Sequence, residues 1–216
     1  GLRYLDCVSG ACVYDLKEKK TLYSQALDPG IVKKLMEFAL EEEAMIHVLS
    51  ERSIVQRDQQ SHMADFHMGI YQTMFDKITD KLENIYNSFC QEPFPVLKLN
   101  LYHKDEYSRA RTVERIKAAG LETALALAES TSLECSAKGI DKGVGLKKLC
   151  EHLGLPLEQT IAVGDADNDT MALKTAGLAV AMGNATEPIK ALADVIVADC
   201  DHNGCAEAID KYLLAD

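Results

Sequence analysis

Short apolar blocks alternate with amphipathic segments through the last third of the chain. From residue 138 onward this pattern predicts helices over 142–153, 168–176, 186–192 and 204–214, with strands over 160–163, 178–182 and 194–197. The connections between these elements are short. Alternation of strand and helix with short links predicts a mostly parallel sheet that is covered on both faces.

The first 130 residues follow a different pattern. Residues 4–14 read as two short strands around a Gly turn, and Asp28-Pro29 is typical of a helix start. Residues 96–102 alternate as Val-Leu-Lys-Leu-Asn-Leu-Tyr, which predicts a half-buried strand. Further elements are expected as strands over 21–26, 44–49, 122–128 and 131–135 and as helices over 29–42 and 106–119, while the polar stretch 50–92 shows only partly helical spacing. We therefore predict an α/β core made of residues 1–15 and 131–216, with an α+β domain of residues 16–130 inserted into it.

Composition narrows the classes of partner. The chain has 216 residues, 47% of them hydrophobic, and a formal net charge of −11. Such an acidic balance argues against nucleic acid and anionic membranes as partners. The seven Cys include no Cys-x-x-Cys pair, and no stretch is long and apolar enough to span a membrane. We expect a cytoplasmic protein.

Acidic residues cluster where one apolar strand ends. Asp165, Asp167, Asn168 and Asp169 directly follow Ile161-Ala162-Val163-Gly164. Ligands bind at the carboxyl ends of strands in α/β sheets, and carboxylate oxygens suit a hard cation such as Mg²⁺. An EF-hand is excluded, because its Gly and Glu positions hold Thr and Ala here. The pattern favours a functional role for Asp165 and Asn168, whereas Asp167 is read as a helix cap.

Lys142 stands at the predicted start of a helix, where a cation opposes the helix dipole. This unfavourable placement indicates that Lys142 serves an anion. Lys138 and Lys147 are interpreted as solvated surface residues.

These motifs, taken in order, resemble the haloacid dehalogenase-like (HAD) phosphatases, specifically the Cof-type members with a large inserted cap. The resemblance rests on Lys138-Gly139-Ile140-Asp141-Lys142-Gly143, on Gly164-Asp165-x-x-Asn168-Asp169, and on Val180-Ala181-Met182-Gly183-Asn184-Ala185. It implies a Rossmannoid core, mostly a parallel sheet, with an inserted α+β cap domain. It covers the C-terminal half strongly and the middle only in outline.

The resemblance also implies a chemistry. It is the Mg²⁺-dependent hydrolysis of small phosphorylated metabolites, such as sugar phosphates, through an aspartyl-phosphate. In that scheme Asp165 and Asp169 bind the metal, Lys142 and Asn168 bind the substrate phosphate, and Lys142 and Asp169 are the catalytic residues.

The chain departs from the family's pattern at its beginning. The family's Asp-x-Asp, which holds the nucleophile, precedes the strand that resembles residues 4–14, and neither Asp6 nor Asp15 fits that motif. We therefore expect an incomplete sheet, closed either by residues 4–8 lying beside residues 160–163 or by a homodimer through exposed sheet edges. We also expect this chain alone to be inactive. Two alternatives stay open, namely a non-catalytic protein that binds an anion or a partner, and a phosphomutase on the same core.

Overall fold

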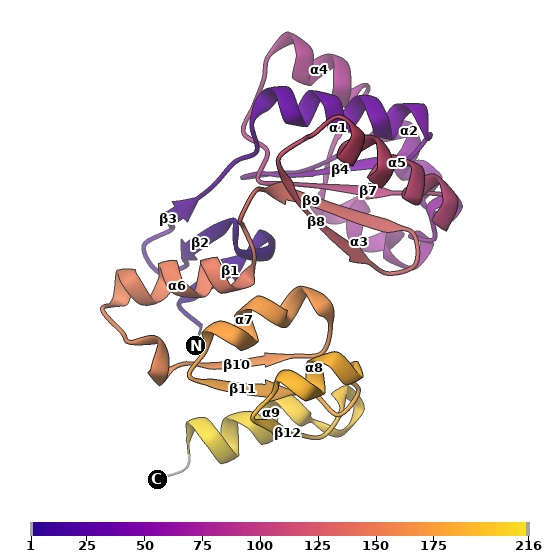
Figure 1. Ribbon diagram of the computed structural model, residues 1–216. Helices are drawn as coiled ribbons and strands as arrows, with labels where there is room; N and C mark the ends of the chain where they lie inside the picture. Colours follow the sequence, from indigo (N-terminus) through magenta and orange to yellow (C-terminus); the bar gives the residue numbers. More distant parts are fainter. Residues whose placement is uncertain (1, 215–216) are drawn as a thin grey trace. The chain divides into compact units, whose positions relative to one another are not determined.

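A computed structural model describes residues 2–214, and these form two compact units (Figure 1). The core unit runs to Ser24 and resumes at Ile140, and the inserted unit is Gln25–Gly139. Strand pairing explains where the chain divides. β3 (Lys20–Ser24) pairs with β2 (Cys12–Asp15) and stays in the core unit. β9 (Ser132–Ala137) pairs with β7 (Lys98–Tyr102) and stays in the inserted unit.

The core unit begins with a small antiparallel sheet in the order β1-β2-β3. Its strands are β1 (Tyr4–Cys7), β2 (Cys12–Asp15) and β3 (Lys20–Ser24). Gly10 turns the chain between β1 and β2 at a φ of +89°, and a Cβ there would lie 1.8 Å from the carbonyl oxygen of Asp141. The predicted pair of strands around a Gly turn is confirmed, and only Gly satisfies both constraints.

The second part of the core unit is a parallel sheet in the order β10-β11-β12. The α/β prediction is confirmed. The elements are α6 (Lys142–Leu153), β10 (Ile161–Gly164), α7 (Thr170–Thr175), β11 (Leu178–Ala181), α8 (Glu187–Leu192), β12 (Val195–Ile196), α9 (Gly204–Ala208) and a final π-helical turn, η7 (Ile209–Leu213).

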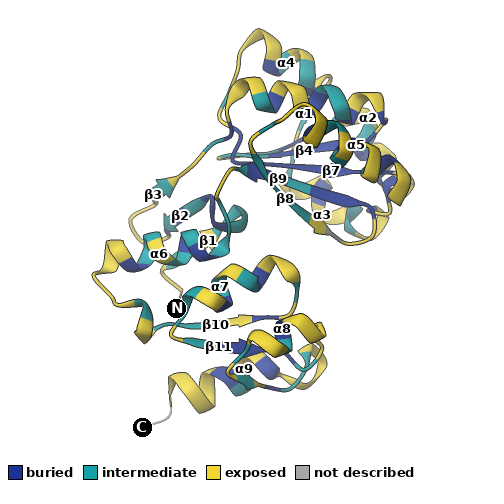
Figure 2. Cartoon of the chain, in the orientation of Figure 1, coloured by how far each residue is buried: buried dark blue, intermediate teal, exposed yellow. Residues whose placement is uncertain are grey.

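One edge of this parallel sheet has no neighbour among the described strands. β10 pairs with β11 on one side only, and Val163 on β10 is 38% exposed. Figure 2 shows β10 less buried than β11. The expectation that residues 4–8 lie beside residues 160–163 in one rearranged sheet is wrong, because β1 pairs with β2 and belongs to a separate sheet.

The inserted unit is built on a sheet in the order β6-β5-β4-β7-β9-β8. Its elements are α1 (Pro29–Glu41), β4 (Met45–Leu49), β5 (Ser53–Gln56), α2 (Arg57–Ser61), α3 (Gln72–Ile78), β6 (Asp80–Leu82), α4 (Ile85–Gln91), β7 (Lys98–Tyr102), α5 (Glu106–Ala118), β8 (Thr123–Ala128) and β9 (Ser132–Ala137). Asp28 caps α1 as predicted, since its Oδ1 accepts hydrogen bonds from the backbone N–H groups of Gly30 and Ile31.

The two faces of this sheet differ in chemistry. One face is aliphatic, and its Val48, Leu99 and Leu101 belong to the same buried cluster as residues of α1, α4 and α5. The other face carries polar residues, and part of it is covered by the segment that contains α2 and α3. The predicted half-buried strand is therefore wrong for residues 98–102, because every residue of β7 is buried. Lys98 tolerates burial because its ammonium pairs with Glu134 at 3.0 Å.

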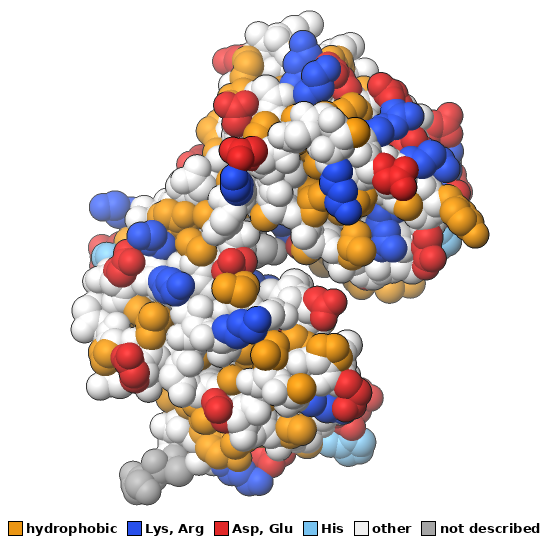
Figure 3. Space-filling view, viewed as in Figure 1, with side chains coloured by type: hydrophobic (Ala, Val, Ile, Leu, Met, Phe, Trp, Pro, Cys, Tyr) orange, Lys and Arg blue, Asp and Glu red, His pale blue; other side chains and the backbone are white. Residues whose placement is uncertain are grey.

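The surface in view carries acidic and basic side chains interspersed on both units (Figure 3). None of the helices in the described part of the chain is long and apolar enough to cross a membrane.

Candidate functional site

The acidic segment follows β10 at the carboxyl end of the parallel sheet. Gly164 ends the strand, and residues 167–169 form a short 3₁₀ turn that leads into α7. A Cβ on Gly164 would lie 2.5 Å from the Cβ of Asp169. The missing side chain lets the Asp169 carboxylate fold back over the strand end, where Asp169 is only 8% exposed.

Lys142 and Asp169 form an ion pair in the core unit. Lys142 is the first residue of α6, whose N-cap Asp141 accepts a hydrogen bond from the Val144 N–H. Its Nζ donates to Oδ1 of Asp169 at 2.5 Å. The second oxygen, Oδ2, accepts from the backbone N–H groups of Asp165 at 3.0 Å and Ala166 at 3.2 Å.

These contacts explain the ionisation of Asp169. Burial alone would raise the pKa of the carboxyl group, but the Lys142 ammonium and the two backbone donors outweigh it, so the pKa lies below its usual range. Asp169 is thus a fixed anion. It holds the Lys142 ammonium in place at the head of the helix.

Asp165 is held differently. Its side chain is exposed, and its Oδ2 accepts a hydrogen bond from Nδ2 of Asn184 at 3.1 Å. The other end of the Asn184 amide accepts from the Cys200 N–H at 3.0 Å. Asn184 thus links Asp165 to Cys200, the first residue of the short 3₁₀ turn before α9, and Oδ1 of Asp165 makes no hydrogen bond to a described residue.

Asn168 and Asp167 lie on the same 3₁₀ turn, and both are exposed. The Asn168 amide makes no hydrogen bond to any described residue. Asp167 gives the turn no side-chain cap, because the N-cap position is Ala166 and the cap-like contacts come from Asp169. The interpretation of Asp167 as a cap is therefore wrong.

A cavity of about 430 Å³ opens within the core unit between β1, α6, β10 and α7. Asp6, Ser9, Lys142, Val163 and Asp169 are among the residues that line it. The cavity therefore joins the Lys142–Asp169 pair to the unpaired edge of β10.

Asp6 is a carboxylate of this cavity that the sequence did not single out. It packs against α6 at Gly145, where a Cβ would lie 2.0 Å from Oδ1 of Asp6. Desolvation raises the pKa of Asp6 to about 6, against the lowering effect of the Lys142 charge. By its accessible surface, however, Asp6 is an exposed residue, so this desolvation comes from the protein atoms packed around it and not from full burial.

The donor set suits Mg²⁺ in kind. No cluster of three His, Cys, Asp or Glu side chains that could hold a metal occurs among the described residues. Mg²⁺, however, commonly binds through one or two carboxylates and completes its shell with water and substrate phosphate. Asp165 has the right ligand atom for this, whereas both oxygens of Asp169 already accept hydrogen bonds.

Sequence reasoning missed Asp6 and Asn184 as site residues. Asn184 could have been found from the sequence, because it lies in the segment just after β11, as Asp165 does after β10, and the carboxyl ends of adjacent parallel strands lie side by side. Asp6 had none, since its position depends on β1 packing against α6.

Comparison with known proteins gives a consistent result. A sequence model of the haloacid dehalogenase-like hydrolases matches residues 2–209. Phosphatase YwpJ of Bacillus subtilis (strain 168) is 46% identical over 83 residues, which make up 38% of this chain and 29% of YwpJ. The chain thus spans less than a third of that relative.

Solved structures share the fold. A haloacid dehalogenase-like hydrolase from Bacteroides thetaiotaomicron aligns with 96% of this chain and 76% of its own, with a TM-score of 0.80 and 26% identity. The sugar phosphatase BT4131, described as HAD subclass IIB, aligns with 99% of this chain and 77% of its own, with a TM-score of 0.79 and 20% identity.

Proposed function

This chain belongs to the haloacid dehalogenase-like hydrolase family, and from that premise we propose that it supplies the phosphate- and metal-binding residues of a Mg²⁺-dependent phosphomonoester hydrolase. The observation that carries the proposal is the Lys142–Asp169 ion pair beside Asp165 at the carboxyl end of β10. The substrate class is small phosphorylated metabolites, with sugar phosphates favoured by the named activity of BT4131.

Lys142 is the phosphate-binding cation in this scheme. Its ammonium has three N–H donors, and Asp169 takes one of them. The side chain is 35% exposed, so the remaining donors can reach a phosphoryl oxygen. Asn168 adds a neutral donor from its exposed position on the 3₁₀ turn. Together they neutralise and orient the phosphoryl group.

Asp165 would hold Mg²⁺ through its free oxygen, and Asp169 would position the Lys142 ammonium and water near the ion. When bound, Mg²⁺ supplies charge neutralisation at the phosphoryl oxygens. Asn184 fixes the orientation of the Asp165 carboxylate through the hydrogen bond to Oδ2.

Hydrolysis through an aspartyl-phosphate proceeds in two steps. A carboxylate oxygen attacks phosphorus while the ester oxygen leaves with the alcohol, and water then cleaves the acyl phosphate to release inorganic phosphate. We assign no described residue to the nucleophile. Lys142 and Asp169 act on the phosphoryl group and its surroundings.

Titration calorimetry with inorganic phosphate and Mg²⁺ tests the site. We expect Lys142→Ala to weaken phosphate binding at least about tenfold, because a charge-assisted hydrogen bond is lost. Lys147→Ala is the matched control, since Lys147 is an exposed residue of the same helix outside the cavity. Equal effects of the two substitutions would overturn the assignment of Lys142.

An assay of phosphate release from a panel of sugar phosphates tests the activity. Release that requires Mg²⁺ and is lost in both Lys142→Ala and Asp165→Asn supports hydrolysis at this site. Phosphate binding without release instead favours the non-catalytic alternative.

A further inference from the structure

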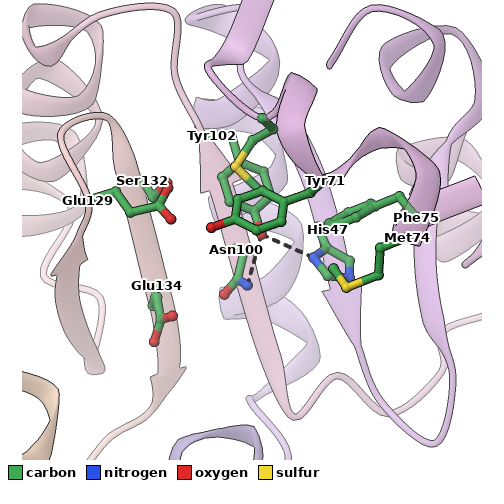
Figure 4. Close-up of a pocket in the computed structure, with 10 residues that line it drawn as sticks. His47, Tyr71, Met74, Phe75, Asn100, Tyr102, Glu129, Ser132 and Glu134 are labelled. Atoms are coloured by element: carbon green, nitrogen blue, oxygen red, sulfur yellow. Dashed lines mark hydrogen bonds between the residues drawn. The ribbon is translucent and has the colours of Figure 1, made fainter. Parts of the chain in front are cut away.

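A second cavity lies entirely within the inserted unit, on the polar face of its sheet (Figure 4). It has a volume of about 230 Å³. Strand register brings its polar residues together, because His47 on β4, Asn100 on β7 and Glu134 on β9 are direct cross-strand neighbours. Neighbours across a sheet point to the same face.

Asn100 is the unusual residue of this cavity. It is 8% exposed, and its Nδ2 donates to the hydroxyl of Tyr102 at 3.3 Å. Its Oδ1 is buried and has no hydrogen-bond partner among the described residues. In Figure 4 this oxygen lies on the side facing the strand of Glu134. Buried acceptors without partners are rare in native proteins, so this oxygen points to a missing donor.

A chain of hydrogen bonds sets the orientation of the amide. Nδ1 of His47 lies 3.2 Å from the Tyr102 hydroxyl, and Nε2 lies 2.8 Å from Oγ of Ser53. Burial, aided by the Lys98 charge, lowers the pKa of His47 to about 4, so the ring is neutral and one nitrogen accepts. When Tyr102 donates to His47, its oxygen accepts from Asn100, and Oδ1 is left facing the cavity.

The charges around the cavity disfavour an anion. No Lys or Arg is found among the described residues that line it. The nearby Lys98 is already paired with Glu134 at 3.0 Å. Glu129 is exposed at the rim and accepts a hydrogen bond from Ser132 at 3.3 Å. The cavity therefore offers acceptors and no free cation.

The remaining walls suit a flat ring. The ring centroids of His47 and Phe75 lie 4.9 Å apart, and Tyr71 and Met74 complete an aromatic and thioether wall (Figure 4). Met74, which lies on α3 one residue before the buried Phe75, is 46% exposed. Aromatic and thioether groups favour contact with the face of a planar ring.

We propose that this cavity binds a neutral, flat ring compound that donates an N–H or O–H hydrogen bond to Oδ1 of Asn100. Tyr71, Met74 and Phe75 contact the ring face. The site lies in the inserted unit alone, so it stands whether or not the core unit hydrolyses phosphate esters.

Three small probes test the proposal on the full chain by NMR titration. Uracil is a neutral ring with N–H donors, 1,3-dimethyluracil has the same ring without donors, and orotate is the same ring with a negative charge. We expect uracil to bind about tenfold more tightly than 1,3-dimethyluracil, because only uracil can donate a hydrogen bond to the buried Oδ1 of Asn100. We expect the same difference between uracil and orotate, because the cavity disfavours an anion. Equal affinity for uracil and 1,3-dimethyluracil, or no uracil binding up to its solubility limit, would overturn the proposal.

Substitution of the amide locates the effect. Asn100→Leu keeps the size of the side chain and removes Oδ1, and we expect the preference for uracil over 1,3-dimethyluracil to disappear while the protein stays folded. Asn87→Leu is the control, because Asn87 is exposed on α4 outside the cavity, and it should keep the preference. If Asn100→Leu does not fold, Tyr71→Ala is used, and unchanged uracil affinity in that variant counts against the site.

Discussion

Acid should destabilise the inserted unit through His47. This imidazole is 7% exposed and neutral, and its pKa in the folded state is about 4 against an ordinary value of 6.5. Between these two values the unfolded chain binds a proton that the folded chain does not, so stability falls as pH decreases from about 6.5 to about 4. From pH 7 to pH 5 the shift corresponds to about 2 kcal/mol, or about 20-fold in the opening equilibrium.

Hydrogen exchange followed by mass spectrometry measures this effect for the inserted unit by itself. Amides of β4 and β7 should lose about 20-fold in protection from pH 7 to pH 5, after correction for the intrinsic exchange rate. Other groups also titrate, including the buried His103, whose pKa is lowered mainly by burial. The comparison is therefore with His47→Gln, which keeps those groups and should lose most of the pH dependence. An identical pH dependence in both proteins would refute the assignment to His47.

Three further predictions concern the core unit. Asp6→Asn should raise the melting temperature at pH 7.5, because burial raises the pKa of Asp6 to about 6 and its charged form is unfavourable. The gain should fade as pH falls below about 4, where Asp6 is protonated in both the folded and the unfolded chain. A gain that persists below pH 4 would contradict this reasoning. Gly145→Ala should lower the melting temperature, since its Cβ would lie 2.0 Å from the Asp6 carboxylate, and Asp6→Ala in the same chain should restore part of the loss. Asn184→Ala should weaken Mg²⁺ binding in calorimetry with little change in phosphate binding, because the Asp165 carboxylate is then free to rotate. An unchanged Mg²⁺ affinity would show that Asn184 does not position Asp165 for the metal.

Local rules predicted much of the fold. The Asp28 cap, the Gly10 turn and the alternation of strand and helix after residue 140 all depend on residues near in sequence, and the structure confirms them. The resemblance to the haloacid dehalogenase-like family, which rests on three short motifs, is confirmed by the family match. Residues 53–56 and 80–82 were missed as strands, because β5 and β6 are short and pair with each other in a segment of mixed polarity.

Whether both faces of a strand are buried was the hardest property to predict. In the sequence, Lys98 and Asn100 occupy positions that are typical of the solvent-facing side of a strand. The residues that allow their burial, Glu134 and Tyr102, come later in the chain. The candidate site shows the same limit. The proximity of Lys142 to Asp169 could be expected from two motifs, whereas the contact of Asp6 with Gly145 depends on packing between distant segments.

The division of the inserted sheet into an aliphatic face and a polar face has a consequence for how this protein can change over evolutionary time. The residues of β7 that hold the helices in place and those that line the polar cavity alternate along the strand, so they are separate positions with separate constraints. Substitutions at Asn100, Glu134 or Ser132 leave Leu99, Leu101 and Leu133 untouched. Ligand preference in this unit can therefore drift while the scaffold keeps its stability, and in a library of variants the two sets of positions should tolerate very different residue types.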